Sequence, residues 1–298
     1  MATSAYEALH GQDVYGTVVK DVISFGVPRE PRGRKTRDMG FTVIELETPY
    51  HAFPYGLRPG LSMKIAVAEA VQLIGGFSNV DLLTKATARF SDFLEPDGHF
   101  HGSYGSRVRY QVANVVHKLQ SDPASRQAVV TLWDPVLDNL ADKKDYPCTV
   151  MLHFEISRRD LLCMTVVMRS NDVWLGLPYD LFQFTQLQCT VARALGLEPS
   201  RYRHVTMSMH IYDEDVAKAL DCDFRTPEFV EYDGMYFTGV GRLGDSFTTM
   251  MKRARVLTTN AENVEETISE RQYRRIFASY LGRTVDGHGE GGGEAQPV

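Results

Sequence analysis

Residues 181–195 form the segment that most constrains what this chain can fold into. The segment is almost continuously apolar, with Gln183, Gln186 and Gln188 interspersed among its apolar residues. A helix that is apolar on nearly all sides has to be surrounded by other elements. We therefore expect a central buried helix over residues 181–195, ended by Gly196.

The elements expected around this helix are of both kinds. Runs rich in β-branched and aromatic residues predict strands, and apolar residues at helical spacing predict helices. These elements follow one another without a regular βαβ rhythm, which indicates an α+β fold. We expect strands over residues 16–25, 40–46, 126–133, 150–156, 161–168 and 204–212, and helices over residues 62–74 and 80–94.

Composition places the chain among folded globular proteins. Its 298 residues are 43% hydrophobic and 23% charged, which is close to average globular usage. Neither a repeat nor a long linker divides it, so we expect one domain over residues 1–283. Residues 284–298 are rich in glycine and have almost nothing to bury, which predicts a disordered tail.

Charge and cysteine content argue against several classes of partner. The 32 basic and 38 acidic residues give a net charge of −6, which disfavours binding to duplex nucleic acid. Uncharged apolar stretches are much shorter than the roughly 20 residues that span a bilayer, and the first residues lack the pattern of a secretory signal. Four widely spaced cysteines without a C-x-x-C pair predict a reduced, cytoplasmic protein without a metal site.

Two residues next to expected strands could carry covalent chemistry. Cys148 in YPCT lies at a strand entrance, but a free cysteine is more often a small buried hydrophobe than a nucleophile. Arg169 follows a strand. A guanidinium there could lower the pKa of a nearby thiol and bind a phosphate, or it could form an ordinary surface ion pair.

Two further features are ambiguous by themselves. Glu69 lies on an apolar helix face, where it is either paired with a base, kept nearly neutral as a general acid or base, or solvated because the helix is rotated. The loop over residues 27–39 is strongly basic. Such a loop is more often solvated than bound to a ligand, although phosphate is its natural anion. Its cations are Arg29, Arg32, Arg34, Lys35 and Arg37.

Several short motifs of the chain occur in a characteristic order. They are VAEAVQLIGGFSN with Glu69, GSYG with Tyr104, DPASRQ at residues 122–127, YPCT at 146–149, RSNDVWLGLPYD at 169–180 and HIY at 210–212. In this order the chain closely resembles thymidylate synthases over roughly residues 15–215. A lone R-S-x-D would not be specific, whereas this many spaced motifs are.

The resemblance implies a mixed sheet packed with helices and a one-carbon transfer from 5,10-methylenetetrahydrofolate to C5 of a pyrimidine nucleotide. Cys148 would attack C6 of the base, which turns C5 into a carbon nucleophile. Arg169 would activate Cys148 and hold phosphate. Glu69 would shuttle protons through water, and Tyr104 would help to remove the C5 proton.

The resemblance also implies binding residues. Ser170 and a loop arginine, for which we choose Arg32, would hold the phosphate. Arg126 would reach across a two-fold interface to the partner's phosphate, which implies a homodimer. His210 and Tyr212 would hold the 3′-hydroxyl of the sugar. The folate side would be formed by Asp172, Gly176, Phe90 and Phe93.

Asp180 is the departure from the synthases with the clearest consequence. Synthases end the long motif in P-F-N, whose asparagine donates to O4 and accepts from N3–H of uracil. In cytosine N3 accepts and the 4-amino group donates, and a protonated carboxyl can donate to one and accept from the other. Such a carboxyl needs a raised pKa, which burial can supply. Asp180 therefore predicts a cytidylate substrate, as in the deoxycytidylate hydroxymethylase branch, although it could also tolerate uracil.

Other departures bear on the product. Thr149 and Gln127 stand where synthases have histidine and arginine, and they leave the covalent chemistry intact. Phe90 and Phe93 stand where synthases have tryptophans, and a Gly-rich end replaces the peptide that closes over the folate. A more open site favours attack by water over transfer of hydride.

We therefore predict 5-hydroxymethyl-dCMP or 5-hydroxymethyl-CMP as the product. The alternatives are a C5 methyltransferase on (d)CMP or dUMP with hydride transfer, and a non-catalytic homologue that binds nucleotide or RNA. The sugar stays open, with a slight preference for deoxycytidylate because Arg126 and Ser170 are retained.

Overall fold

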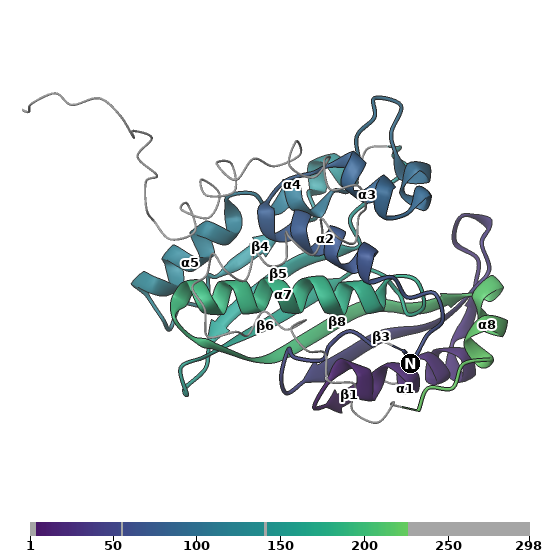
Figure 1. Cartoon of the computed structure of the whole chain (residues 1–298), viewed down its shortest axis with the longest axis horizontal. Coiled ribbons are helices and arrows are strands. Elements are labelled where there is room, and N and C mark those ends of the chain that lie inside the picture. The colour runs from purple at the N-terminus through teal and green to yellow at the C-terminus, as the bar shows by residue number, and fades with distance from the viewer. Residues whose placement is uncertain (1–3, 55, 140–141, 226–298) are drawn as a thin grey trace, which may run out of the picture.

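A mixed sheet forms the centre of the computed structural model, which describes residues 4–54, 56–139 and 142–225 (Figure 1). The strand order is β1-β3-β8-β6-β5-β4, with β2 beside β3 and β7 beside β8. The sheet and its helices make the α+β fold that the sequence predicts. The strands are β1 (Ser4–Ala8), β2 (Val27–Arg29), β3 (Thr36–Leu46), β4 (Val129–Thr131), β5 (Thr149–Ile156), β6 (Leu161–Met168), β7 (Asn171–Asp172) and β8 (Glu198–Tyr212).

A layer of helices covers one face of this sheet, with α7 (Leu177–Leu195) and α2 (Met63–Gly75) packed against each other (Figure 1). The expected central helix is confirmed, because Leu181, Phe184 and Leu187 are completely buried. The helix begins at Leu177, before the expected start, since a proline fits the first turn of a helix. Gly196 ends it in the left-handed conformation, at φ 73°.

The prediction of a strand over residues 16–25 is wrong, because these residues belong to helix α1 (Gly11–Phe25). The segment is rich in valine and isoleucine, which favour strands. However, Val14, Val18 and Val22 recur at helical spacing and are buried, and α1 packs against β3. Burial of one helical face therefore outweighs the local preference of β-branched residues.

Residues 80–94 form two short helices in place of the single helix expected. The α-helix α3 (Val80–Ala86) is followed at Thr87, whose backbone is extended, by the 3₁₀-helix η2 (Ala88–Phe93). The Thr87 hydroxyl accepts a hydrogen bond from the backbone N–H of Arg89, which favours a break at this position. The remaining helices are α4 (Tyr104–Val108), α5 (Gln111–Ser121), α6 (Pro135–Asp138) and α8 (Asp213–Leu220).

The other strand predictions hold with changed boundaries. Strands β5, β6 and β8 lie where they were expected, whereas only β4 forms within residues 126–133. The basic segment over residues 27–39 is only partly a loop. It contains β2, the 3₁₀-helix η1 (Pro31–Gly33) and the start of β3.

The ends of β5, β6 and β8 bring distant motifs together. The backbone N–H of Arg169 donates to the carbonyl of Cys148 at 2.8 Å, and that of Val173 donates to the carbonyl of His210 at 2.8 Å. Asp172 pairs with His210 in the register of β7 and β8. The YPCT, RSND and HIY motifs therefore meet at one place in the sheet.

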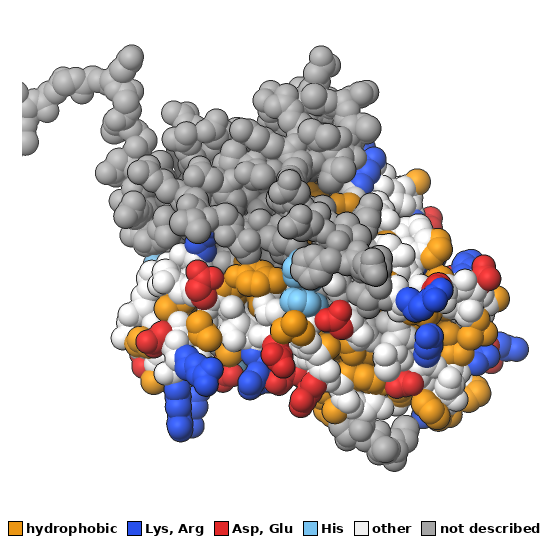
Figure 2. All heavy atoms as spheres, turned by 60° about the horizontal axis from the view of Figure 1, so that its bottom comes forward, with side chains coloured by type: hydrophobic (Ala, Val, Ile, Leu, Met, Phe, Trp, Pro, Cys, Tyr) orange, Lys and Arg blue, Asp and Glu red, His pale blue; other side chains and the backbone are white. Residues whose placement is uncertain are grey.

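The expected domain boundary at residue 283 and the expected tail over residues 284–298 lie outside the described residues. Among the described helices, none combines the length and apolar character that crossing a bilayer requires. Figure 2 shows the face that carries α1 and β1, where basic and acidic side chains are interspersed among apolar ones.

Candidate active site

Cys148 and Arg169 lie side by side at the ends of β5 and β6. The Arg169 side chain donates from Nε to the carbonyl of Pro147 at 3.0 Å, and its Nη2 lies 3.8 Å from Cys148 Sγ. Burial raises the pKa of the Cys148 thiol to about 11, and the charge of Arg169 opposes this rise. The guanidinium is therefore placed to stabilise a thiolate at Cys148.

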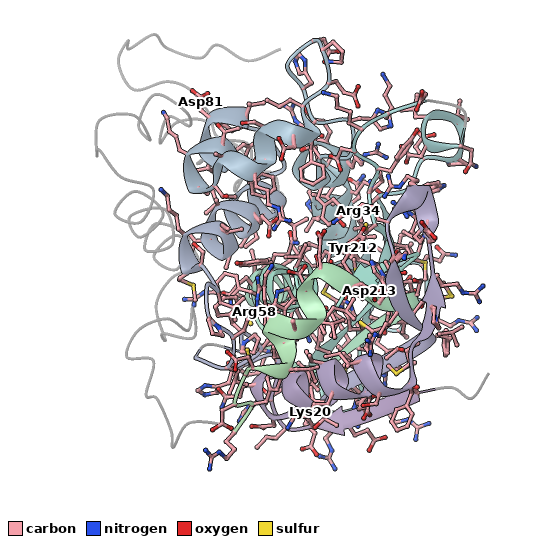
Figure 3. The ribbon with its side chains drawn as sticks, turned by 90° about the vertical axis from the view of Figure 1, so that its right-hand side faces the viewer. Lys20, Arg34, Arg58, Asp81, Tyr212 and Asp213 are labelled. Carbon is pink, nitrogen blue, oxygen red and sulfur yellow. The ribbon has the colours of Figure 1, made fainter. Side chains whose placement is uncertain are left out.

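The arginines of the basic segment have different partners. Arg34 donates to Glu214 at 2.6 Å, and its guanidinium lies over the Tyr212 ring, 3.7 Å from the ring centroid. Figure 3 labels Arg34 and Tyr212, together with Asp213 at the start of α8. Arg37 donates to the carbonyl of Ile23 at 2.8 Å. Asp213 lies 3.7 Å from Arg37 Nε, so two acidic residues of α8 relieve part of the repulsion within the segment.

Arg32 differs from these arginines. It lies in η1 with a positive φ of 54°, and it is exposed. In the described part of the chain it has no hydrogen bond or ion pair, yet its charge lowers the pKa of the Cys148 thiol. An arginine that is unengaged and close to the thiol suits a bound phosphate better than one already paired.

Tyr104 approaches the site from α4. Its hydroxyl accepts hydrogen bonds from the backbone N–H of Thr149 at 3.2 Å and from the Thr149 hydroxyl at 3.1 Å. The ring stacks on Phe184 of α7, at 6.1 Å between centroids. Burial raises the pKa of Tyr104 well above its usual range, so the hydroxyl keeps its proton. Because it accepts twice from Thr149, that proton is free to point at another group.

Glu69 of α2 has no basic partner among the described residues, and it is only partly solvated. Its Oε2 is buried, and no hydrogen-bond partner for it lies in the described residues. Burial raises the pKa of Glu69 to about 8, and the negative charge of Asp180 adds to the rise. Most of the Glu69 carboxyl is therefore neutral at physiological pH. Of the three possibilities that the sequence leaves open for Glu69, the nearly neutral acid fits this environment.

Asp180 lies in the first turn of α7 and is 7% exposed. Its Oδ2 accepts from Asn171 Nδ2 at 2.7 Å, and its Oδ1 accepts from Gln183 Nε2 at 3.0 Å. Burial raises the pKa of Asp180 to about 7, although both amides oppose the rise. The carboxyl therefore exchanges a proton readily near neutral pH.

The residues expected around the sugar and phosphate come from three places. His210 and Tyr212 lie in β8, Ser170 lies between β6 and β7, and Arg126 lies before β4. Ser170 Oγ lies 3.5 Å from His210 Nδ1, and the rings of His210 and Tyr212 stand nearly perpendicular at 5.5 Å. Arg126 is exposed, and within the described residues it has no hydrogen bond or ion pair. These side chains are accessible to a ligand or to a second subunit.

The residues expected to face folate differ in their burial and in their contacts. Asp172 accepts at Oδ1 from the backbone N–H groups of Trp174 at 2.8 Å and Leu175 at 2.9 Å. Its Oδ2 is buried without a partner among the described residues, so an acceptor is available there. Phe90 packs edge-on against Phe100 at 6.2 Å, whereas Phe93 is 42% exposed.

Sequence reasoning missed the partners that hold the site residues. Asn171 stood inside the long motif and Gln183 inside the central helix, but neither was assigned to Asp180. The spacing of Asp180 and Gln183, three residues apart on one helix, could have indicated their contact. Thr149 was noted only as a replacement. Its contact with Tyr104 joins segments 45 residues apart in sequence and carries no local signal.

Comparison with known proteins identifies a family for this chain. A family model described as thymidylate synthase matches residues 13–230. Relatives named deoxyuridylate hydroxymethyltransferase occur in Bacillus phage SP01, 28% identical over 230 residues, and in Pseudomonas phage M6, 31% identical over 156 residues. A thymidylate synthase of Clostridium beijerinckii is 27% identical over 210 residues.

The matched regions differ in coverage. They take in 72%, 50% and 68% of this chain for the SP01, M6 and Clostridium proteins, in that order. The chain spans 59% and 44% of the two phage proteins and 78% of the Clostridium protein. In the part of the chain that the structure describes, no group of three or more His, Cys, Asp or Glu residues is arranged to hold a metal ion.

Proposed function

This chain belongs to the thymidylate synthase family, and from that premise we propose that it transfers a one-carbon unit to C5 of a cytosine nucleotide. We propose 5-hydroxymethyl-dCMP or 5-hydroxymethyl-CMP as the product. One observation carries the choice of base, namely the buried carboxyl of Asp180 between two amides. With its pKa raised to about 7, the neutral form of Asp180 is available at physiological pH.

The neutral carboxyl suits cytosine. Its O–H can donate to N3 of the base, and its other oxygen can accept from the 4-amino group. The amides of Asn171 and Gln183 occupy one lone pair on each carboxyl oxygen. Each oxygen therefore keeps one further position for the base.

Cys148 acts as the nucleophile in this proposal. Its thiolate forms a bond from Sγ to C6, and the π electrons of the C5–C6 bond shift so that C5 can attack an electrophilic carbon. Arg169, 3.8 Å from the sulfur, favours the thiolate that this step needs. Tyr104 and Glu69, both protonated near neutral pH, exchange protons with the reacting groups.

The binding residues complete the proposal. Arg32 and Ser170 hold the phosphate, His210 and Tyr212 the sugar, and the exposed Arg126 reaches the phosphate of a second subunit in a homodimer. The reaction takes place in the cytoplasm, in keeping with four free cysteines. Residues 1–283 form its single domain.

The folate side fits a pterin-type donor. Oδ2 of Asp172, which has no partner in the described part of the chain, offers an acceptor, and Phe93 exposes an aromatic face. Asp172, Gly176, Phe90 and Phe93 would hold 5,10-methylenetetrahydrofolate, which supplies the one-carbon unit when bound. The exposure of Phe93 admits water to this side, and water addition gives a hydroxymethyl group without oxidation of tetrahydrofolate. The names of the two phage relatives support the same outcome.

A uracil nucleotide is the second candidate substrate. The observation that favours it is the word deoxyuridylate in the names of the phage relatives. A methyl product would be the second candidate outcome, favoured by the similarity to the Clostridium thymidylate synthase.

One assay separates these candidates. The full chain is incubated with 5,10-methylenetetrahydrofolate and equal amounts of dCMP, CMP and dUMP, and nucleotide masses are followed together with dihydrofolate absorbance. We expect hydroxymethylcytosine nucleotide without dihydrofolate. A product formed only from dUMP would contradict the cytosine assignment, and dihydrofolate with a methyl product would contradict water addition.

The matched variant is Cys148→Ser. It should bind nucleotide but form no product, because an alcohol does not replace a thiolate as the attacking group. Undiminished turnover by this variant would rule out the covalent route. Absence of turnover in the wild type as well would favour a nucleotide-binding or RNA-binding role without catalysis.

A further inference from the structure

Asp180 is connected to a chain of buried hydrogen bonds that ends on β8. Asn171 Nδ2 donates to Asp180 Oδ2 at 2.7 Å, and Asn171 Oδ1 lies 3.0 Å from His204 Nε2. His204 Nδ1 in turn lies 2.9 Å from the Tyr202 hydroxyl. Asn171 is 3% exposed, and His204 and Tyr202 are completely buried. Water therefore does not replace any of these partners.

The donors and acceptors of this chain match when Asn171 Nδ2 donates to Asp180. Burial lowers the pKa of His204 to about 3, so the imidazole is neutral and carries a single proton. Because Asn171 uses its N–H on the carboxylate, its Oδ1 has to accept, which places the His204 proton on Nε2. Nδ1 of His204 then accepts the hydroxyl proton of Tyr202. Asn171 is thereby held at both ends as a donor to Asp180 Oδ2.

Gln183 holds the other oxygen of Asp180 less firmly. It donates to Oδ1 at 3.0 Å, and within the described residues its own Oε1 makes no hydrogen bond. The Gln183 amide can therefore turn by itself and accept a proton carried by Oδ1. The Asn171 amide can turn only if His204 moves its proton from Nε2 to Nδ1 and the Tyr202 hydroxyl reverses as well. The two carboxyl oxygens are consequently not equivalent.

This difference matters because a neutral carboxyl alone does not distinguish the two bases. Cytosine requires the proton on the oxygen that faces N3, and uracil requires it on the oxygen that faces position 4. A carboxyl free to carry its proton on either oxygen would read both. A firm donor on one oxygen makes that oxygen less basic and leaves the proton on the other.

We propose that Oδ1 of Asp180 is the oxygen that faces N3 of the base. Asn171, oriented by His204 and Tyr202, is then a positioning residue that keeps the proton of Asp180 on Oδ1 and thereby favours cytosine over uracil. This inference rests on the proposed function of Asp180. Gly176 leaves the room that the pair needs, because a Cβ there would lie 3.2 Å from Asn171 Nδ2 and 3.3 Å from Asp180 Oδ2.

The test is the ratio of kcat/KM for cytosine and uracil nucleotides in the full-length enzyme. Asn171→Leu removes the donor at similar volume, and His204→Leu removes the group that orients it. His204→Gln retains an amide N–H toward Asn171. Gln188→Leu is the matched control. Gln188 is a buried amide of α7, as Gln183 is, but it donates to the carbonyls of Leu162 and Ser200 and not to Asp180.

We expect Asn171→Leu to lower the cytosine-to-uracil ratio about tenfold or more, the effect of one lost bond to a carboxyl. His204→Leu should lower it severalfold. The ratio should stay within about twofold of wild type in His204→Gln and Gln188→Leu, because both keep the Asn171 donor in place. An unchanged ratio in a folded Asn171→Leu enzyme would overturn the inference, and Asn171→Ala takes its place where the leucine variant does not fold.

A second measurement separates this inference from the proposed function. The carboxyl band of Asp180 is titrated by isotope-edited infrared spectroscopy without any substrate, with Asp180→Asn as the blank. Loss of the Asn171 donor should move the titration of Asp180 to higher pH, because the carboxylate loses a stabilising hydrogen bond. If the wild type prefers uracil, the proposed function fails. The role of Asn171 then stands if the titration moves and falls if it does not.

Discussion

Asp138 and Asp180 are both buried carboxyls, and their surroundings are opposite. The Asp138 side chain is completely buried and receives two hydrogen bonds from Arg107, at 2.7 and 2.8 Å, and one from His101 at 2.8 Å. These partners hold the pKa of Asp138 below its usual range in spite of burial. Asp180 is held by two amides, and its pKa rises to about 7.

The difference separates a carboxylate that stabilises the fold from a carboxyl that can exchange protons. Asp138 stays ionised near neutral pH and ties α6 to α4 through Arg107. Asp180 and the neighbouring Glu69 have no cationic partner among the described residues, so burial controls their protonation. Cationic partners thus keep the Asp138 carboxylate ionised. Without such partners among the described residues, the carboxyls of Asp180 and Glu69 can exchange protons near neutral pH.

The largest effect is expected from breaking the charged cluster. Arg107→Met leaves the charge of Asp138 buried without its main partner, which should cost about 3–5 kcal/mol of unfolding free energy. Urea denaturation measures this loss, with Arg109→Met at an exposed position as the control. The base preference of the folded fraction should be unchanged. A loss below about 1 kcal/mol would show that the cluster does not have the structural role assigned to it.

Glu69→Gln should lower the rate without a loss of stability. The substitution removes an exchangeable proton, and loss of a general acid or base lowers kcat by roughly 10²- to 10⁴-fold. Stability should not fall, because Glu69 Oε2 has no hydrogen bond to lose among the described residues. Single-turnover kinetics and denaturation test both points. Glu45→Gln, which removes a carboxylate paired with Arg203, is the control that should retain its rate.

Asp180→Asn should change base preference in favour of uracil, by about 100-fold in the ratio of kcat/KM values. An amide presents one donor and one acceptor, and the order that uracil needs is reached when its N–H faces position 4 of the base and the Asn171 amide turns to accept from it. The variant should also lower the pKa of the Cys148 thiol, because the charge of Asp180 raises it. The pH dependence of alkylation by iodoacetamide measures that pKa. Retained cytosine preference would contradict the assignment of Asp180.

The smallest effect is a difference in how stability depends on pH. The folded-state pKa of Asp180 lies above its usual 3.8, so the folded protein binds the extra proton between about pH 4 and 7. The contribution of Asp180 to stability is therefore full below pH 4 and declines as pH rises, by about 1.4 kcal/mol per pH unit. Asp180→Asn should flatten this slope in urea titrations between pH 5 and 6. A slope equal to that of the wild type would show that Asp180 is already ionised in that range.

Asp138 should show the opposite sign. Its folded-state pKa lies below the usual value, so its contribution is full above pH 4 and is lost as pH falls through the folded-state pKa. Asp138→Asn should therefore lose stability at neutral pH. The loss relative to wild type should shrink in acid.

Prediction from sequence succeeded where the signal was local. The central helix, the strands β5, β6 and β8, and the long motif over residues 169–180 each carry their pattern in consecutive residues. It failed at α1, where a valine-rich segment has the local preference of a strand and packs as a helix. Packing against β3 decides that case, and the short windows that define a local preference do not contain both partners.

The residue types that carry chemistry are determined by the sequence alone. A thiol at Cys148, a guanidinium at Arg169 and a carboxyl in place of an amide at Asp180 are covalent facts, and their order indicates the family. Only the tertiary structure decides the state of these groups. The distance from Arg169 to the thiol, the lack of a partner for Arg32 among the described residues and the pKa of Asp180 depend on elements that meet through folding. The physical reason is that desolvation and Coulomb interactions act through space, whereas the sequence specifies neighbours along the chain.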